Sequence, residues 1–460
     1  MDPLHDVNRW AEENFGGAVL GDKRRTERLV FSAARIARHP GRPFTQTFDW
    51  NELRGFYGVC NCEQATHDAV SLGHWRKTRQ AMADEPVALI LHDTTELDFT
   101  SHKALRGQGP VGEGTTTGFL QHNSLAVTPR PRRVLGLACQ QFVVRKPAPP
   151  GETSYQRRRR AGRESLMWPR GIKASGKAPE GRLWVDVGDR GADIYEAMGQ
   201  ARELDHHFLF RVKQNRKVYL NEDKTRSAYL KDYARSLPAK GKDEVRIEGR
   251  GGRGPRTAKV ELASATVWVP ASAEVPRRAS QPVCQAWVLR VWEPNPPEEA
   301  EDAIDWILLC SVPSETLEEL RERRDWYSCR WMVEIFHDIE KNGCGMEDRR
   351  FETAGAMAPC LAVLGIVAAR VFQLRCALES QPDEPAEQVA TTLEIAVMKT
   401  YLGHDKRRRF TVRDFVLGVA KLGGYLGRKG DGPPGVRTLW KGYERFQDMM
   451  MAAELLAKAP

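Results

Sequence analysis

Three acidic residues, Asp93, Asp189 and Glu334, are candidates for a catalytic site. Asp93 follows a short apolar run at residues 87–91 (VALIL), and Asp189 follows another at residues 183–187 (LWVDV). Runs of this kind predict buried strands, and carboxylates at the ends of neighbouring strands can converge at one edge of a sheet. Glu334 lies much further along the chain, inside a predicted helix. The pattern therefore predicts acids from three separate segments that can share one site.

Three carboxylates brought together repel one another unless cations neutralise them, so this set points to a divalent-metal site. Mg²⁺ prefers carboxylate oxygens, water and substrate phosphates, and two ions about 3.5–4 Å apart can activate both the attacking and the leaving oxygen. Mn²⁺ is the expected substitute. Taken singly, each acid is more simply interpreted as a cap or turn residue. Rival acids lie close by in the sequence at Asp98, Asp186 and Asp193.

The predicted helix around Glu334 carries a second chemical pattern. With Tyr327 as the origin of a helical wheel, an advance of about 100° per residue places Arg330, Glu334 and Lys341 within about 60° of one another and of the tyrosine. Trp331 falls at the edge of this face. The opposite stripe is apolar and predicts a buried side; it consists of Met332, Ile335, Phe336 and Ile339. A solvated face would also collect charges, but an acid beside Arg, Lys and a phenol suits a metal-bound phosphodiester.

Three motifs together resemble the bacterial DDE cut-and-paste transposases of insertion-sequence family four, most closely the transposon-five type. They are HDTT at Asp93, GDRGADIY at Asp189 and YSCRWMVEIFHDIEK at residues 327–341. The last motif matches the Y-(2)-R-(3)-E-(6)-K signature of that family, and the likeness spans nearly the whole chain. Gly191 is a departure, because the closest relatives carry an acid at this position.

The resemblance implies the α/β fold class, with a ribonuclease H-like catalytic core (a mixed sheet with flanking helices) that a β-rich insertion interrupts. It implies that Asp93, Asp189 and Glu334 are catalytic and hold two Mg²⁺ ions. Contacts to the transposon-end backbone near the cleavage site would come from Tyr327, Arg330 and Lys341.

The resemblance also implies that a base beside the scissile phosphate is flipped out and stacked on a tryptophan of the insertion. Trp306 occupies the matching position, Trp331 would fill the gap that the base leaves, and Arg211 would lie near the flipped base. A core tryptophan at a strand start is the alternative for Trp306. Residues 17–30 (GAVLGDKRRTERLV) look like the DNA-binding segment of the family; its basic residues include Lys23, Arg24 and Arg25.

The chain has 460 residues, enough for two to four domains of roughly 100–200 residues each. Lys and Arg number 70 against 61 Asp and Glu, a net charge of +9 that suggests a polyanionic partner. The predicted order is a helical DNA-binding domain (1–83), the first part of the core (84–213), the β-rich insertion (214–313), the second part of the core with the Glu334 helix (314–353) and a helical dimerisation domain (354–460).

The predicted function is Mg²⁺-dependent cut-and-paste transposition by end nicking, hairpin formation, hairpin resolution and strand transfer. The expected partners are double-stranded DNA (inverted-repeat ends and target) and a second copy of the chain, each subunit cutting the end bound mainly by the other. The alternatives are a non-joining nuclease of the same fold and a catalytically silent DNA-binding regulator of transposition. A bacterial cytoplasmic location at the nucleoid is expected, without a membrane partner. The longest apolar run, residues 354–369, is shorter than about 18 residues and predicts a buried helix.

Overall fold

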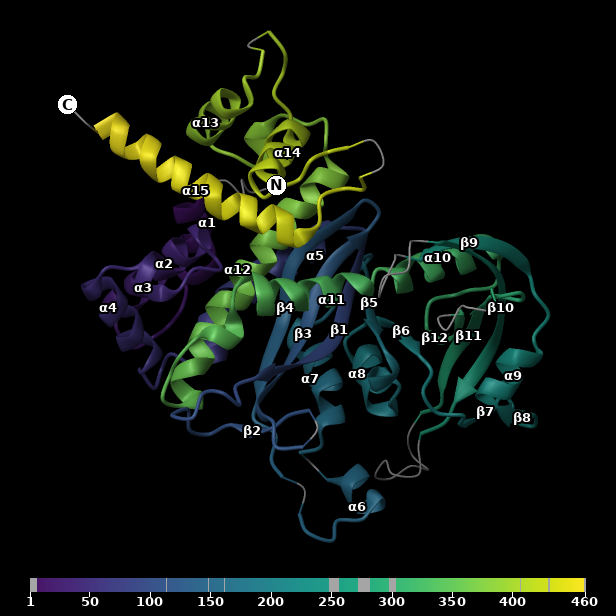
Figure 1. The fold of residues 1–460 in the computed structure, drawn as a ribbon. Coiled ribbons are helices and arrows are strands. Elements are labelled where there is room, and N and C mark those ends of the chain that lie inside the picture. Colours follow the sequence, from purple (N-terminus) through teal and green to yellow (C-terminus); the bar gives the residue numbers. More distant parts are fainter. Residues whose placement is uncertain are drawn as a thin grey trace. The chain divides into compact units, whose positions relative to one another are not determined.

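The computed structural model describes residues 6–112, 114–147, 149–160, 162–247, 256–271, 282–297, 303–405, 407–428 and 431–458. The chain forms two compact units (Figure 1). Unit 1 comprises Met1–Asp84, Thr94–Pro147 and Met332–Pro460, and unit 2 comprises Glu85–Asp93 and Ala148–Trp331. The predicted domain boundaries do not coincide with these units and stay a prediction.

Unit 1 begins with the helices that the apolar spacing predicts for residues 8–83. They are α1 (Val7–Phe15), α2 (Lys23–Arg38), α3 (Phe44–Thr47), α4 (Trp50–Cys60) and α5 (His67–Asp84). The side chains of Asp6, Asp22 and Asp49 cap α1, α2 and α4 by accepting hydrogen bonds from first-turn N–H groups. The helices bury an apolar stripe that includes Leu29 and Phe56.

The strands β2 (Gly109–Pro110), β3 (Thr117–Pro129) and β4 (Arg132–Val143) of unit 1 form an antiparallel ribbon, and α5 packs on it. β2 pairs with β3, and β3 pairs with β4. The pairing of β3 with β4 contains register shifts after Ser124 and Ala126. Because α5 and α12 (Ala354–Ser380) pack on β4, most of β3 and the middle of β4 are buried.

The helix α12 is longer than the predicted apolar run. Its length and composition would allow it to span a bilayer, but 94% of its most apolar window is buried inside the protein. This agrees with the prediction of a buried helix. The chain then continues through the 3-10 turn η6 (Ala386–Gln388), α13 (Thr392–Leu402), α14 (Val412–Leu422) and α15 (Val436–Lys458), which share an apolar core. The sequence predicts a helix over residues 387–402. The structure has this helix, but it starts five residues later, at Thr392.

Unit 2 is built on a mixed sheet. The first half of β1 (Val87–Asp98) runs parallel to β5 (Leu183–Gly188), and β5 runs parallel to β6 (His207–Arg211). Antiparallel strands follow in the order β12 (Asp305–Cys310), β11 (Cys284–Trp292), β10 (Arg256–Val269), β7 (Lys217–Tyr219) and β8 (Ser227–Tyr229), and β9 (Gly241–Ile247) also pairs with β10. The strands of the predicted insertion thus continue the sheet of the core, because β12 pairs directly with β6.

Helices of unit 2 pack on this sheet through one apolar cluster. Residues of α7 (Met167–Ser175), α8 (Tyr195–Glu203) and α9 (Leu230–Ser236) join side chains from β6, β10, β11 and β12 in it. The short helix α6 (Ser154–Arg159) carries part of the basic run at residues 157–160, where Arg157 and Arg160 pair with Glu152. The helix α9 lies within the stretch that the sequence predicted to be β-rich.

The sequence predicts one continuous helix around Glu334, over residues 315–342. This prediction is wrong. The structure has α10 (Leu317–Ser328), then α11 (Trp331–Asp338), then a π-helical turn, η4 (Ile339–Gly343). A helical wheel assumes one constant rotation per residue, and the break and the π turn both change it. Tyr327 is consequently buried, with 4% of its surface exposed, whereas Trp331 is 43% exposed. Met332, Phe336 and Ile339 are buried as predicted, but Ile335 is only half-buried.

Candidate active site

The carboxyl ends of two adjacent parallel strands carry Asp93 and Asp189. The last parallel pair between β1 and β5 is His92 with Gly188, so each aspartate directly follows this pair: Asp93 within β1 and Asp189 just after the end of β5. One detail of the prediction is wrong: β1 continues to Asp98, so Asp93 lies within a strand rather than beyond its end. The parallel pairing, rather than the end of the strand, places the two residues at corresponding positions of adjacent chain segments.

The conformation of Asp189 is fixed by the turn after β5. Its Oδ1 accepts a hydrogen bond from the backbone N–H of Gly191 (2.8 Å) and caps the 3-10 turn η2 (Arg190–Ala192). The departure at Gly191 also has a local cause. A Cβ at this position would lie 2.4 Å from Cζ2 of Trp168 in α7, so the tryptophan ring occupies the space that a side chain would need.

Cations and a phenol surround the two aspartates within unit 2. Nη1 of Arg330 lies 3.4 Å from Oδ2 of Asp93, with both side chains less than one-fifth exposed. Burial raises the pKa of the Tyr327 phenol, and the positive charges of Arg330 and Arg211 partly oppose this effect. The negative charge of Asp189 also raises this pKa, so Tyr327 senses the aspartate and both arginines.

Trp306 and Arg211 belong to the same neighbourhood. The ring of Trp306 in β12 packs edge-on against Tyr327, with centroids 5.2 Å apart. Arg211 is the last residue of β6 and is opposite Leu308 in β12. Trp306 is half-buried, neither a closed core residue nor a fully exposed ring. The structure thus brings together four of the residues predicted to contact DNA: Arg211, Trp306, Tyr327 and Arg330.

The rival acid Asp186 is part of the core of unit 2. Its side chain is fully buried, Nε2 of His92 donates to Oδ1 (2.8 Å) and Nδ1 of His206 donates to Oδ2 (2.9 Å). Nε2 of His206 faces the carbonyl oxygen of Gly176 (2.9 Å), so both ring nitrogens meet acceptors. Burial opposes ionisation, but His206 and His92 hold the pKa of Asp186 below its usual value, and Asp186 raises the pKa of His206 despite burial.

The other two rivals also have structural partners. Asp193 is buried, and its Oδ2 accepts hydrogen bonds from the backbone N–H groups of Lys213 (2.7 Å) and Gln214 (3.1 Å). In unit 1, Asp98 is exposed and accepts a hydrogen bond from the N–H of Thr100 (2.8 Å). Hydrogen bonding to the side chain of Thr100, and then to its backbone N–H, lowers the pKa of Asp98.

Glu334 and Lys341 belong to unit 1. Glu334 lies in the first turn of α11 and is half-buried. Lys341 lies in the π turn, with its Nζ 3.7 Å from Oε1 of Glu347. Trp331, the first residue of α11, belongs to unit 2.

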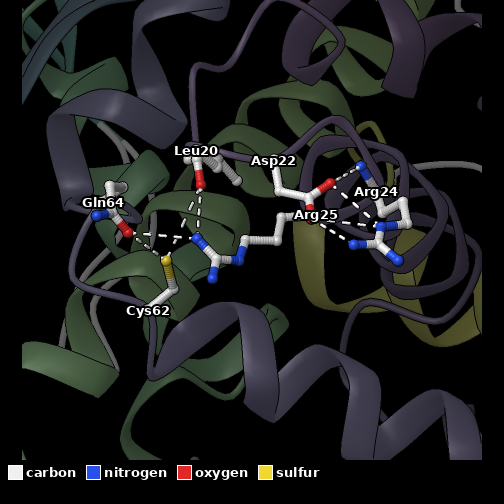
Figure 2. Close-up of polar contacts among 6 residues, drawn as sticks. All are labelled: Leu20, Asp22, Arg24, Arg25, Cys62 and Gln64. Carbon is white, nitrogen blue, oxygen red and sulfur yellow. Dashed lines mark hydrogen bonds and ion pairs between the residues drawn. The ribbon is translucent and has the colours of Figure 1, made fainter.

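The N-terminal basic residues divide into exposed and anchored side chains (Figure 2). Lys23 and Arg24 are 91% and 87% exposed, although Arg24 also binds the N-cap residue Asp22 (2.9 Å). Arg25 is instead held by the protein, because its Nη1 donates to the carbonyl oxygen of Leu20 (3.0 Å) and to Oε1 of Gln64 (3.3 Å). Lys23 and Arg24 are therefore the better placed of the three to meet DNA.

The donor set suits a hard divalent cation. Asp93 and Asp189 offer carboxylate oxygens at one strand edge, which are the ligands that Mg²⁺ and Mn²⁺ favour. Within the described ranges no group of three His, Cys, Asp or Glu side chains forms a ready-made metal site. The guanidinium of Arg330 neutralises part of the charge of Asp93 instead.

Two structural features were not predicted from the sequence: the buried histidine partners of Asp186 in unit 2 and the buried position of Glu340 in unit 1. The buried trio of His92, Asp186 and His206 lies directly behind the strand ends, and Glu340 in the π turn is fully buried. The histidine of the HDTT motif was a visible signal for the first. No local pattern distinguishes Glu340 from a surface glutamate, because its partners lie about 200 residues away along the chain.

Comparison with protein families agrees with this architecture. Residues 7–65 match the transposase DNA-binding family, residues 185–357 match the transposase DDE domain, and residues 382–457 match the transposase Tn5 dimerisation domain. The DDE match spans Asp189 and the segment from Tyr327 to Lys341.

These matches and the mixed α/β fold define a DNA-binding DDE transposase, an enzyme of phosphoryl transfer with a dimerisation domain. The DDE domain implies a ribonuclease H-like core and the use of divalent metal. The chain belongs to the Tn5-type transposases, as the three motifs in its sequence predicted. The roles of the individual site residues stay predictions.

Proposed function

We propose that the chain catalyses cut-and-paste transposition with Asp93, Asp189 and Glu334 as its catalytic carboxylates. The observation that carries this proposal is the position of the two aspartates, each directly after the last pair of two parallel strands. The surroundings of two rivals favour structural roles for them and so support the proposal: Asp186 and Asp193 are buried and hydrogen-bonded within the core.

The assignment of Glu334 rests on chain continuity. Arg330 contacts Asp93, and Glu334 follows four residues later in the helix that begins at Trp331. Four helical residues advance only about 6 Å, so the chain can bring Glu334 near the aspartates. Glu334 is also half-buried, in contrast to the closed environment of Asp186.

Two Mg²⁺ ions, or Mn²⁺ in their place, would activate the attacking hydroxyl and stabilise charge on the phosphate when bound by these carboxylates. The residues of the chain would hold the DNA around that position. Arg330 and Lys341 would bind backbone oxygens, and Tyr327 would donate its hydroxyl hydrogen to one. The raised pKa of Tyr327 keeps the phenol protonated for this purpose.

Trp306 would receive a base flipped out beside the cleavage point, since a half-buried ring offers one face for stacking. Trp331 would enter the gap that the base leaves, and Arg211 would contact the neighbouring phosphate. Lys23, Arg24 and Arg25 would belong to the surface that recognises the transposon end, Arg25 mainly by shaping it.

The order of reactions would be end nicking, attack of the freed 3′-hydroxyl on the opposite strand to form a hairpin, hydrolysis of the hairpin and joining to target DNA. Only the nucleophile changes between these steps, so one carboxylate site suffices. Two copies would pair through the C-terminal helices, each cutting the end bound mainly by the other. The reaction would take place at the nucleoid of a bacterial cytoplasm.

The test uses purified protein, Mg²⁺ and DNA with the inverted repeats that flank the gene. The wild type and Glu334→Ala are compared on gels for nicks, hairpins and joined products, with Glu352→Ala as a control because its side chain is 86% exposed. Metal-dependent cutting and joining that Glu334→Ala alone abolishes would support the proposal. Cutting by Glu334→Ala at the wild-type rate would contradict it.

A further inference from the structure

The fully buried carboxylate of Glu340 lies inside a shell of amide donors in unit 1. Its Oε1 accepts hydrogen bonds from Nε2 of Gln121 (2.7 Å) and Nε2 of Gln140 (2.8 Å), and its Oε2 accepts one from Nδ2 of Asn123 (2.9 Å). All four side chains are at most 1% exposed. Two of the amides come from β3 and one from β4, so the carboxylate ties the π turn to this ribbon.

The amide shell is itself held in one orientation. Nε2 of Gln140 also donates to Oδ1 of Asn123 (2.7 Å), and Nε2 of His67 donates to Oε1 of Gln140 (3.0 Å). Gly365 of α12 makes room for this arrangement, since a Cβ there would lie 2.7 Å from the amide of Gln140. Because three N–H groups converge on Glu340, its side chain must present acceptors to all of them.

Glu340 and Lys341 are consecutive residues of the π turn η4. The hydrogen bond from the N–H of Cys344 to the carbonyl oxygen of Ile339 (2.7 Å) spans five residues, which defines the wide turn. Such turns are rare and need support from outside the helix. The direction of Lys341, inside the same turn, therefore depends on what holds the turn in place.

Lys341 is also constrained on its far side. Its Nζ faces Oε1 of Glu347 (3.7 Å), and the same oxygen accepts a hydrogen bond from the N–H of Asp98 (2.9 Å). Glu340 thus points inward to the amides, while the neighbouring Lys341 points toward Glu347 and the end of β1. Burying an ionisable carboxyl group is costly whether it keeps its charge or its proton, and a structural glutamine or leucine would have avoided that cost.

We propose that Glu340 is a positioning residue: its amide-bound carboxylate fixes the π turn and thereby sets where Lys341 meets the DNA backbone. This inference rests on the proposed function, because it takes Lys341 as a phosphate contact. The ligand that the turn serves is the transposon-end phosphodiester.

The test measures binding of end DNA by the full-length protein between 50 and 200 mM salt, without divalent metal. Each lost phosphate contact lowers the slope of log affinity against log salt by about 1. A change in stability alone does not alter this slope for folded protein. The variants are Lys341→Ala, Glu340→Gln and both together, with the exposed Glu352→Gln as the matched control.

We expect Lys341→Ala to lower the slope by about 1 and Glu340→Gln to lower it by a similar amount. The double variant should bind like Lys341→Ala alone, because the glutamate acts through the lysine. Glu352→Gln should bind like the wild type. Additive losses in the double variant, or a wild-type slope for Glu340→Gln, would overturn the inference.

A rescue variant separates positioning from a general packing defect. In Glu340→Gln the new NH₂ group faces an N–H donor, and Asn123→Asp converts that donor into an acceptor without changing the shape. The pair Glu340→Gln with Asn123→Asp should recover the wild-type salt slope. A slope like that of Lys341→Ala would contradict the proposal, and this pair decides the question if Glu340→Gln alone does not fold.

The outcomes also separate this inference from the proposed function. A wild-type slope for Lys341→Ala would show that Lys341 does not contact a phosphate, and it would overturn the inference. The cleavage comparison of the wild type with Glu334→Ala would not be affected. Absence of metal-dependent cutting by the wild type would instead overturn the proposed function.

Discussion

Asp186 and Asp189 lie three residues apart at the end of one strand, yet their surroundings are opposite. Asp186 is fully buried and each of its oxygens binds a histidine. Asp189 is half-buried at the edge of the sheet and accepts a backbone N–H at the turn. Glu340 and Glu334 repeat this contrast within one helical segment of unit 1. An acid whose oxygens are saturated inside the core supports the fold, and an acid at an accessible edge is available for chemistry.

The largest expected effect concerns the accessible acids. Asp189→Asn should reduce cleavage at least about 1,000-fold, because loss of a metal ligand removes several kcal/mol of transition-state stabilisation. Stability should change by less than about 1 kcal/mol, since the site is half-buried. Cleavage gels and urea unfolding measure the two quantities.

The matched control is Asp205→Asn, an exposed residue whose positive φ (57°) suits asparagine. It should cut at the wild-type rate. The distinction between the two aspartates of the strand end would fail if Asp189→Asn kept its activity or unfolded like a core variant.

The second effect concerns the buried acid, for which we expect a large loss of stability where Asp189→Asn should lose mainly activity. Asp186→Asn should lower the free energy of unfolding by about 3–5 kcal/mol, because it leaves His206 buried without the carboxylate that favours its protonated form. Urea unfolding followed by tryptophan fluorescence measures this loss. An Asp186→Asn protein as stable as the wild type would show that the buried trio does not hold the strands together.

The third effect concerns the pH dependence of stability. Burial raises the pKa of Glu340 from 4.5 to about 8, and its amide partners partly oppose the rise. The native state then retains a proton that the unfolded state releases, so this residue lowers stability as pH increases from 4.5 to 8. Below that window its contribution is constant.

Glu340→Gln removes this titration. The stability of the wild type minus that of Glu340→Gln should therefore fall by about 1 kcal/mol per pH unit within the window. The free energy of unfolding of both proteins, measured at pH 5, 6, 7 and 8, tests this prediction. The contributions of titratable groups that both proteins share cancel in the difference. A constant difference would mean that the carboxyl does not titrate there.

The smallest effects belong to the N-terminal basic residues. Lys23→Ala should weaken end binding a few-fold and lower the salt slope by about 1 or less, with unchanged stability, because the side chain is 91% exposed. Arg25→Ala should instead lower stability by about 1 kcal/mol, since it loses hydrogen bonds to Leu20 and Gln64. Filter binding and thermal unfolding distinguish the two, and identical behaviour would contradict the contrast between the exposed Lys23 and the anchored Arg25.

Much of the site was predictable because it depends on local pattern. The apolar runs before Asp93 and Asp189 predict buried strands, and the structure confirms both strands; their parallel pairing was not predicted. The helical segments at both ends of the chain were also visible from their spacing. The end of β1 was not, because its second half, residues 93–98 (DTTELD), is almost entirely polar and carries no apolar run that predicts a strand.

The remainder depends on partners that are distant in the chain. A helical wheel assumes a constant turn, and it failed where the chain breaks after α10 and widens at η4. Asp186 and Asp189 look alike in sequence, because only the histidines of β1 and the turn before β6 distinguish them. The amide shell of Glu340 requires the pairing of β3 with β4, which residue spacing does not reveal.

The claim that Asp189 binds the divalent ion can be tested most directly by changing its ligand chemistry. In Asp189→Cys a thiolate, softer than a carboxylate, disfavours Mg²⁺ more than Mn²⁺. End cleavage by this variant should be lost in Mg²⁺ and should recover at least about tenfold in Mn²⁺, whereas the wild type cuts in both. Wild-type cleavage by Asp189→Cys in Mg²⁺ would contradict the account.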